Sequence, residues 1–282
     1  MLDWDSFDRW LNSTPIIIVT VFALVAMLAA ATIGSVLRER RDTRRAKQDV
    51  DLEGDRKGYL VSAVLGLLAL LMGFTFALAV DRYEIRRALV LEEANAIGTT
   101  YLRAQLLEAP HRARISALLV AYTDNRIALA TAAQGEGAAL LARNDALLTD
   151  LWTATAAAYP TISGAPFSST FVESMNAVID MDAARKAARG AHIPTAVLLV
   201  LLIYLVVTAG VMGYVLKAEG RGTAAFVLLL LVLSLTLVID IDRPGRGLVR
   251  ERQFAMEQLR ASLAAQPPEV FDRWRDDGRE ER

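Results

Sequence analysis

Three charged residues follow a long uncharged stretch of this chain and could act on ions. Asp81 and Arg82 come directly after residues 58–80, which contain no Asp, Glu, Lys or Arg, and Arg86 follows one helical turn later. In a ring of subunits, arginines facing the axis at this point would attract anions, whereas Asp81 facing it would attract cations. The alternative is that these charges anchor a helix at a membrane surface and form ion pairs with their neighbours. The sequence leaves the rotation of this helix open.

A second charged group follows another uncharged stretch nearer the C-terminus and comprises Asp240, Asp242 and Arg243. Arginines here can neutralise the two aspartates, so we predict a structural clasp at the start of the tail rather than a metal site. The chain has two histidines and no cysteine, which excludes disulfides and the usual zinc ligand sets. We therefore predict no metal and no cofactor.

Neither catalysis nor nucleic-acid binding is indicated. The serines have no histidine placed as a partner, and the glycines form neither a phosphate-binding loop nor a dinucleotide fingerprint. A formal net charge of −1 gives no basic surplus for a phosphate backbone. We therefore predict that the protein is not an enzyme and binds no nucleic acid.

The elements that must position these charges are membrane helices. Hydrophobic residues make up 54% of the chain, and they gather in blocks near the ~20 residues that cross a bilayer. The predicted spans are residues 15–37, 58–80, 193–216 and 223–240. The first two form a hairpin over 15–80 and the last two form another over 193–241. Residues 1–14, with two tryptophans among acidic residues, suit a segment lying at the membrane interface.

Between the hairpins, residues 81–192 predict a helical extramembrane domain that continues from the second span without a break. Apolar residues alternate at spacings of three and four, as in the seam of a packed helix. They are Val90, Ala94, Ile97, Tyr101 and Ala104. Glu92, Glu93 and Asn95 lie beside this seam, and we expect them to be solvated or to make polar contacts between subunits; the alternative is an ion site.

Two further features concern packing and the tail. Gly210 and Gly213 lie three apart in the third span and predict close contact with another helix. Residues 242–282 read as an amphipathic, charged tail with a helix from Leu248 to about Ala265. The fold class is thus an all-α membrane protein with four transmembrane helices in two hairpins and a helical domain between them.

The exit of the second span resembles a known family. Gly73-Phe74 followed by Asp81-Arg82-Tyr83-Glu84, within LLMGFTFALAVDRYEIRRALVLEEANAIGTTYLRA, together with IDIDRPGRG, is similar to the bacterial bestrophin-like family. The order of elements is also similar to that of bestrophin ion channels. The resemblance covers nearly the whole chain.

This resemblance implies a homopentamer in a bacterial inner membrane, with the second span lining an ion pathway. The hydrophobic neck of that pathway would be formed by Gly66, Leu70 and Phe74, whose spacing of four places them on one helical face. The implied permeant ions are small anions such as chloride. The tail lacks the long acidic run of calcium-gated bestrophins, so we predict no calcium gating.

Membrane orientation depends on which of two arguments is followed. Residues 38–57 hold eight basic residues, and the positive-inside rule would place them in the cytoplasm and the middle domain outside. The resemblance places the middle domain in the cytoplasm, and we adopt that arrangement.

The function predicted from the sequence is an oligomeric ion channel. The alternative is a non-conducting receptor or scaffold that uses the middle domain to bind a ligand or partner. A transporter with inverted repeats is disfavoured, because the two hairpins differ in loop length and no span is interrupted.

Overall fold

The fold is helical throughout the part of the chain that can be described. The computed structural model describes residues 14–44, 51–132, 135–216, 220–244, 249 and 251–273, and every regular element within these ranges is a helix. The predicted all-α class is therefore confirmed for these residues. The interfacial segment predicted at 1–14 lies outside them except for Thr14.

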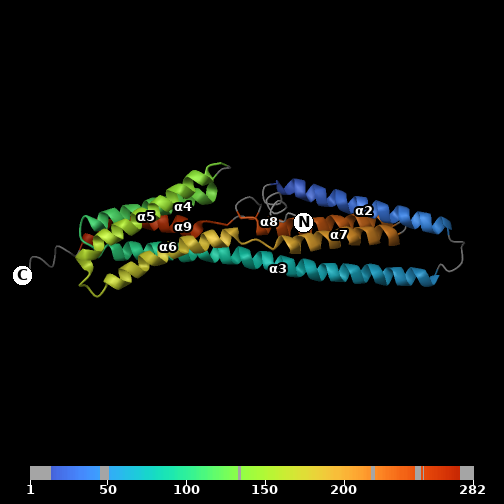
Figure 1. The fold of residues 1–282 in the computed structure, drawn as a ribbon, viewed down its shortest axis with the longest axis horizontal. Helices are drawn as coiled ribbons and strands as arrows, with labels where there is room; N and C mark the ends of the chain where they lie inside the picture. Colours follow the sequence, from blue (N-terminus) through green and yellow to red (C-terminus); the bar gives the residue numbers. More distant parts are fainter. Residues whose placement is uncertain are drawn as a thin grey trace, which may run out of the picture. The chain divides into compact units, whose positions relative to one another are not determined.

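The described helices follow one another with short connections (Figure 1). In chain order they are α2 (Ile16–Arg44), α3 (Asp51–Ala104), α4 (His111–Thr131), α5 (Gly137–Ile162), α6 (Ser168–Gly190), α7 (Thr195–Val215), α8 (Arg221–Asp242), α9 (Phe254–Ala265) and the 3-10 helix η2 (Pro268–Asp272). Helix α3 is one uninterrupted helix of 54 residues, roughly 80 Å long at 1.5 Å per residue. The second span and its polar extension are thus a single element.

Four described segments are long and apolar enough to cross a membrane. They are Ile16–Arg41, Gly58–Ala104, Ser168–Val215 and Gly222–Asp242. To within one residue at either end, each contains one of the four stretches predicted from the sequence, so the prediction of four apolar candidate spans is confirmed. Their pairing into two hairpins across a bilayer stays a prediction.

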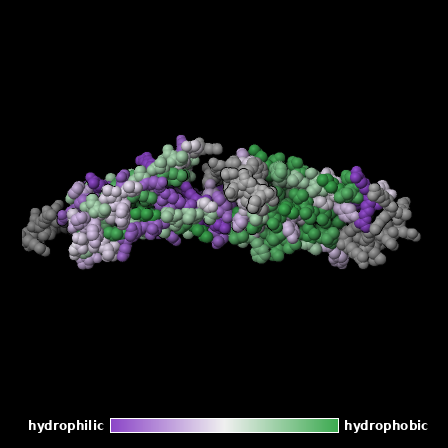
Figure 2. Space-filling model, viewed as in Figure 1, coloured by the Kyte–Doolittle hydropathy of each residue, from purple (hydrophilic) through white to green (hydrophobic). Residues whose placement is uncertain are grey.

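The chain divides into two compact units. One boundary falls within α3, after Tyr83, and the other two lie on either side of residues 192–250. The first unit, residues 1–83 and 192–250, contains α2, α7, α8 and the beginning of α3. Its buried side chains come from all four helices, for example Met27, Leu68, Leu205 and Val232. Most of its visible surface is hydrophobic (Figure 2), as expected for helices that face lipid.

Helices α2 and α7 contact each other backbone to backbone through two glycines. A Cβ added at Gly213 would lie 2.0 Å from the carbonyl oxygen of Ala31, and one added at Gly34 would lie 2.1 Å from that of Gly210. A Cβ at Gly210 would lie 3.6 Å from the nearest atom, the carbonyl oxygen of Ala30, which is an ordinary contact. The close helix contact predicted at Gly210 and Gly213 is therefore confirmed. Of these two residues, Gly213 is the one that has no room for a side chain.

The second unit, residues 84–191 and 251–282, contains α4, α5, α6, α9 and the rest of α3. The predicted seam of α3 is buried at every position: Val90, Ala94, Ile97, Tyr101 and Ala104 are each 5% exposed or less. They pack with residues such as Leu119, Leu151 and Met175 from the other helices of the unit. Periodicity alone therefore identified the inner face of this helix.

The last long helix begins later than predicted. Helix α9 starts at Phe254, and residues 251–253 are not helical, so the predicted start at Leu248 is wrong. Glu251 lies 2.9 Å from Arg86, and Gln253 lies 3.4 Å from Arg185. These tertiary contacts hold the segment in an irregular conformation, which local helix propensity does not reveal.

Candidate functional site

The proposed neck residues share an uncovered face of α3. Leu70 is 54% exposed and Phe74 is 63% exposed in the protomer, and Gly66 has open space where a side chain would begin. The opposite face carries Leu68 and Met72, which are buried in the core of the first unit. Because Leu70 and Phe74 are large and apolar, this face requires cover from lipid or from other copies of the chain.

Of the three charged residues proposed at the exit of the neck, Asp81 is the one that continues this face. It follows Phe74 by seven residues, about two helical turns, and so lies within about 20° of it around the helix. Asp81 is exposed, whereas Arg82, about 100° further round, is half-buried. The helix therefore presents apolar residues and then a carboxylate along one exposed row.

Arg86 is placed quite differently from Asp81. Its side chain is buried, and its Nε lies 2.9 Å from Oε1 of Glu251, whose side chain is 9% exposed. The neighbouring Arg87 is exposed and pairs with Glu84 at 3.3 Å. Arg86 thus serves an ion pair inside the second unit.

The three residues predicted to form a tail clasp are buried and bound to the backbone of other segments. The Asp242 carboxylate accepts hydrogen bonds of 3.0 and 3.1 Å from the backbone N–H of Ile193, just before α7. Asp240 accepts one of 2.9 Å from the backbone N–H of Val249. Arg243 donates one of 2.8 Å to the carbonyl of Thr14, just before α2. The end of α8 is thereby joined to the starts of two other spans.

His192 also lies at the end of α8. Its Nδ1 is 3.5 Å from Oδ2 of Asp242 and 3.2 Å from the carbonyl oxygen of the same residue. The carboxylate of Asp242 therefore contacts both residues that precede Pro194 at the start of α7. This arrangement is that of a structural joint between two spans.

A buried group of charges in the second unit was not anticipated. Glu93 is fully buried, its Oε1 lies 2.9 Å from Nε of Arg126, and its Oε2 accepts a hydrogen bond from Arg185. Arg126 also donates to Asp182 at 3.0 Å. The expectation that Glu93 is solvated or contacts another subunit is therefore wrong.

A sequence signal for this buried carboxylate does exist. Glu93 lies three residues after Val90 and four before Ile97, and therefore at the spacing of the apolar seam itself. What the sequence does not reveal is which cations from α4 and α6 meet it. A charge at a seam position requires such partners, because burying a charge without a partner costs much free energy.

The surroundings of this group shift the acidity of its members. Burial, reinforced by the negative charge of Glu93, raises the pKa of the Tyr122 hydroxyl, which donates to Glu93 at 2.7 Å. Burial alone would lower the pKa of Arg126, but Glu93 beside it reverses this, and the net shift is upward. Burial and the neighbouring Arg185 lower the pKa of Arg189. The upward shift of the Arg126 pKa favours the charged guanidinium beside the carboxylate of Glu93.

Comparison with known proteins identifies the fold. A crystal structure of a bacterial bestrophin homologue from Klebsiella pneumoniae matches with a TM-score of 0.63 and 14% identity, covering 87% of this chain and 97% of that one. A variant of the same homologue matches with a TM-score of 0.63 and 13% identity, covering 90% of this chain and 99% of that one. At such identities the likeness shows a shared fold. The search of curated proteins found no match.

The sequence itself matches a family model, that of the Bestrophin-like domain, over residues 26–250. This range includes the neck residues, Asp81 and the tail clasp. It also spans most of both units described above. The chain therefore belongs to the Bestrophin-like family, as its motifs predicted.

Proposed function

We propose that this protein is a homopentameric ion channel of a bacterial inner membrane, with α3 lining the pathway. The observation that carries the proposal is the exposed row on α3, where Leu70 and Phe74 are followed by Asp81. In a closed ring this row faces the axis and the uncovered apolar side chains gain cover from one another. A narrow apolar ring of this kind controls conduction by wetting and dewetting.

The same row bears on the sign of the permeant ion. The family resemblance implies small anions, and among the charges at the exit of the span, Arg82 or Arg86 would have to face the axis to attract them. Arg86 is instead buried against Glu251, and Arg82 is half-buried, about 100° around the helix from Asp81. A ring of Asp81 carboxylates attracts cations, so we propose small inorganic cations in place of chloride.

The neck is tested by measuring ion flux through vesicles that contain the purified protein. Leu70→Ala and Phe74→Ala widen the neck and should raise the flux. The matched control is Phe22→Ala, because Phe22 on α2 is 56% exposed, close to the 63% of Phe74, but lies on another helix. Absence of flux from the wild type and from both neck variants, or an equal rise with the control, refutes the proposal.

Selectivity is tested by the reversal potential across a salt gradient. Asp81→Asn should move it toward anions, whereas Asp150→Asn, which removes another exposed aspartate, should leave it unchanged. A wild-type channel that selects anions would refute cation selectivity and leave the channel itself standing.

Orientation is tested with an impermeant thiol reagent, since the chain contains no cysteine. A single cysteine in place of the exposed Glu136 reports on the middle domain. This position is preferable to Gly135, whose φ of 106° favours glycine. We propose that the middle domain is cytoplasmic, so labelling from outside intact cells would overturn this arrangement.

The alternative function, a non-conducting receptor or scaffold, has one observation in its favour. An open groove of about 590 Å³ lies between α4 and α9 in the second unit, lined by residues that include Ile127, Glu257 and Arg260. Such a groove could accept a partner segment. Oligomeric state separates the two functions: a five-membered ring supports the channel, whereas a dimer whose α3 helices face lipid supports the scaffold.

A further inference from the structure

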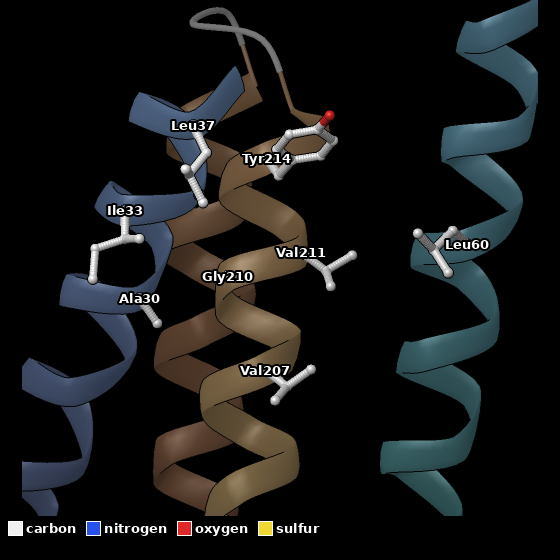
Figure 3. A pocket seen from close by; sticks show the side chains of 9 residues that line it. Ala30, Ile33, Leu37, Leu60, Val207, Gly210, Val211 and Tyr214 are labelled. Carbon is white, nitrogen blue, oxygen red and sulfur yellow. The ribbon is translucent and has the colours of Figure 1, made fainter. Parts of the chain in front are cut away.

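An open apolar groove crosses α7 in the first unit, between α2 and α3 (Figure 3). Ile33 and Leu37 belong to its α2 side, while Val207 and Val211 of α7 point toward Leu60 of α3. The groove has a volume of about 380 Å³, within the range of about 300–1,000 Å³ typical of ligand sites. Its lining is that of a site for a hydrocarbon chain.

The groove is a consequence of small residues on α7. Gly213 allows backbone contact between α2 and α7, and this close approach shapes the groove between the two helices. Gly210 lines this groove (Figure 3) and, although a Cβ would fit there at ordinary contact distance, has none.

Two arginines of α2 lie beyond one end of the groove. Tyr214 lines that end, and Arg41 donates a hydrogen bond to its hydroxyl with the guanidinium 6.0 Å from the ring centroid. Arg38 donates to the carbonyl of Leu216, where α7 ends. Arg41 follows Leu37 by four residues, and so lies on the same face of α2.

The charges at this end of α2 leave it cationic. Arg40 and Arg44 add positive charges, and Glu39 and Asp42 negative ones, so residues 38–44 carry four positive charges and two negative. The apolar window of α2 ends at Arg41, where a helix leaves the hydrocarbon core and arginine side chains reach toward phosphate groups. A guanidinium has five N–H donors and can bind a phosphate while retaining another bond.

We propose that this groove is a binding site for an anionic phospholipid, with one acyl chain over Gly210 and the phosphate against Arg38 and Arg41. An apolar channel between spans that ends in arginines matches both parts of such a molecule, and basic pockets between membrane helices favour anionic headgroups. The site belongs to the first unit alone and does not depend on conduction.

The test uses fluorescence quenching by lipids with brominated chains. A single cysteine carrying a fluorophore replaces Ile203, which is 50% exposed and lies one turn before Val207 at the rim of the groove. A second protein carries the label in place of Phe22, which is 56% exposed and outside the groove. Each is placed in phosphatidylcholine bilayers containing brominated phosphatidylglycerol or brominated phosphatidylcholine.

At position 203, phosphatidylglycerol should bind about five-fold more strongly than phosphatidylcholine, the effect of roughly one basic residue near an anionic lipid. At position 22 the two lipids should quench equally. Arg38→Gln with Arg41→Gln should abolish the preference, whereas Arg41→Lys, which keeps the charge, and Arg40→Gln should retain it. Circular dichroism checks that each variant is folded.

Three results would overturn the proposal. Equal quenching by both lipids at position 203 would show an ordinary lipid-facing surface. Absence of quenching by either lipid there would show that another copy of the chain covers the groove. A preference that survives the double arginine variant would place the anionic headgroup elsewhere.

Discussion

Glu93→Ala tests how strongly the second unit depends on one buried carboxylate. In the native protein Glu93 binds Arg126 at 2.9 Å, accepts a hydrogen bond of 2.7 Å from Tyr122, and binds Arg185 with its other oxygen. Alanine removes all three interactions. It leaves two arginines in the interior with Asp182 as the remaining carboxylate of the group.

The cost follows from the charges left behind. Breaking a buried ion pair by removing one partner destabilises a protein by about 3–5 kcal/mol, because the other charge stays buried without compensation. Each kcal/mol of lost stability lowers the unfolding midpoint by about 2–4 °C for a protein of 150–250 residues. The midpoint should therefore fall by roughly 6–20 °C. The Tyr122 hydroxyl also loses its acceptor, which places the expected effect in the upper part of this range.

The assay is thermal unfolding of the detergent-solubilised protein, followed by circular dichroism. Glu92→Ala is the matched control, because Glu92 is the same residue type one position earlier on α3 but is exposed, and it should change stability by less than about 0.5 kcal/mol. If Glu93→Ala is no less stable than Glu92→Ala, the reasoning about the buried charges is refuted.

Two further predictions concern the first unit. Gly213→Ala should lower stability by about 1–3 kcal/mol through overpacking against Ala31, whereas Gly210→Ala should be tolerated; equal unfolding midpoints for the two variants would argue against the backbone contact. Asp242→Ala should cost about 1–3 kcal/mol, since it leaves the N–H of Ile193 buried without its acceptor. Unchanged hydrogen exchange at that amide would contradict the proposed joint.

Several parts of the fold follow from local sequence pattern. Uncharged stretches of about 20 residues identified the four spans, because a bilayer accepts few charges over that length. Spacings of three and four identified the buried seam of α3 from Val90 to Ala104. The glycines of the third span predicted a close helix contact, which occurs at Gly213. All three signals depend on residues near one another in the chain.

Contacts between distant residues decided the rest. The late start of α9 depends on Glu251 and Gln253 meeting Arg86 and Arg185, pairings that no local pattern specifies.

By itself, then, the sequence determined the helical class, the spans, the family and the inner face of α3, because hydrophobic periodicity within one helix reports directly on burial. The tertiary structure alone decided the roles of the charges: Glu93 is buried among arginines, Arg86 is paired inside its unit, and Asp81 is exposed in line with Phe74. The reason is physical. The environment of a charge is set by whichever helices pack against it, and those partners come from remote parts of the chain.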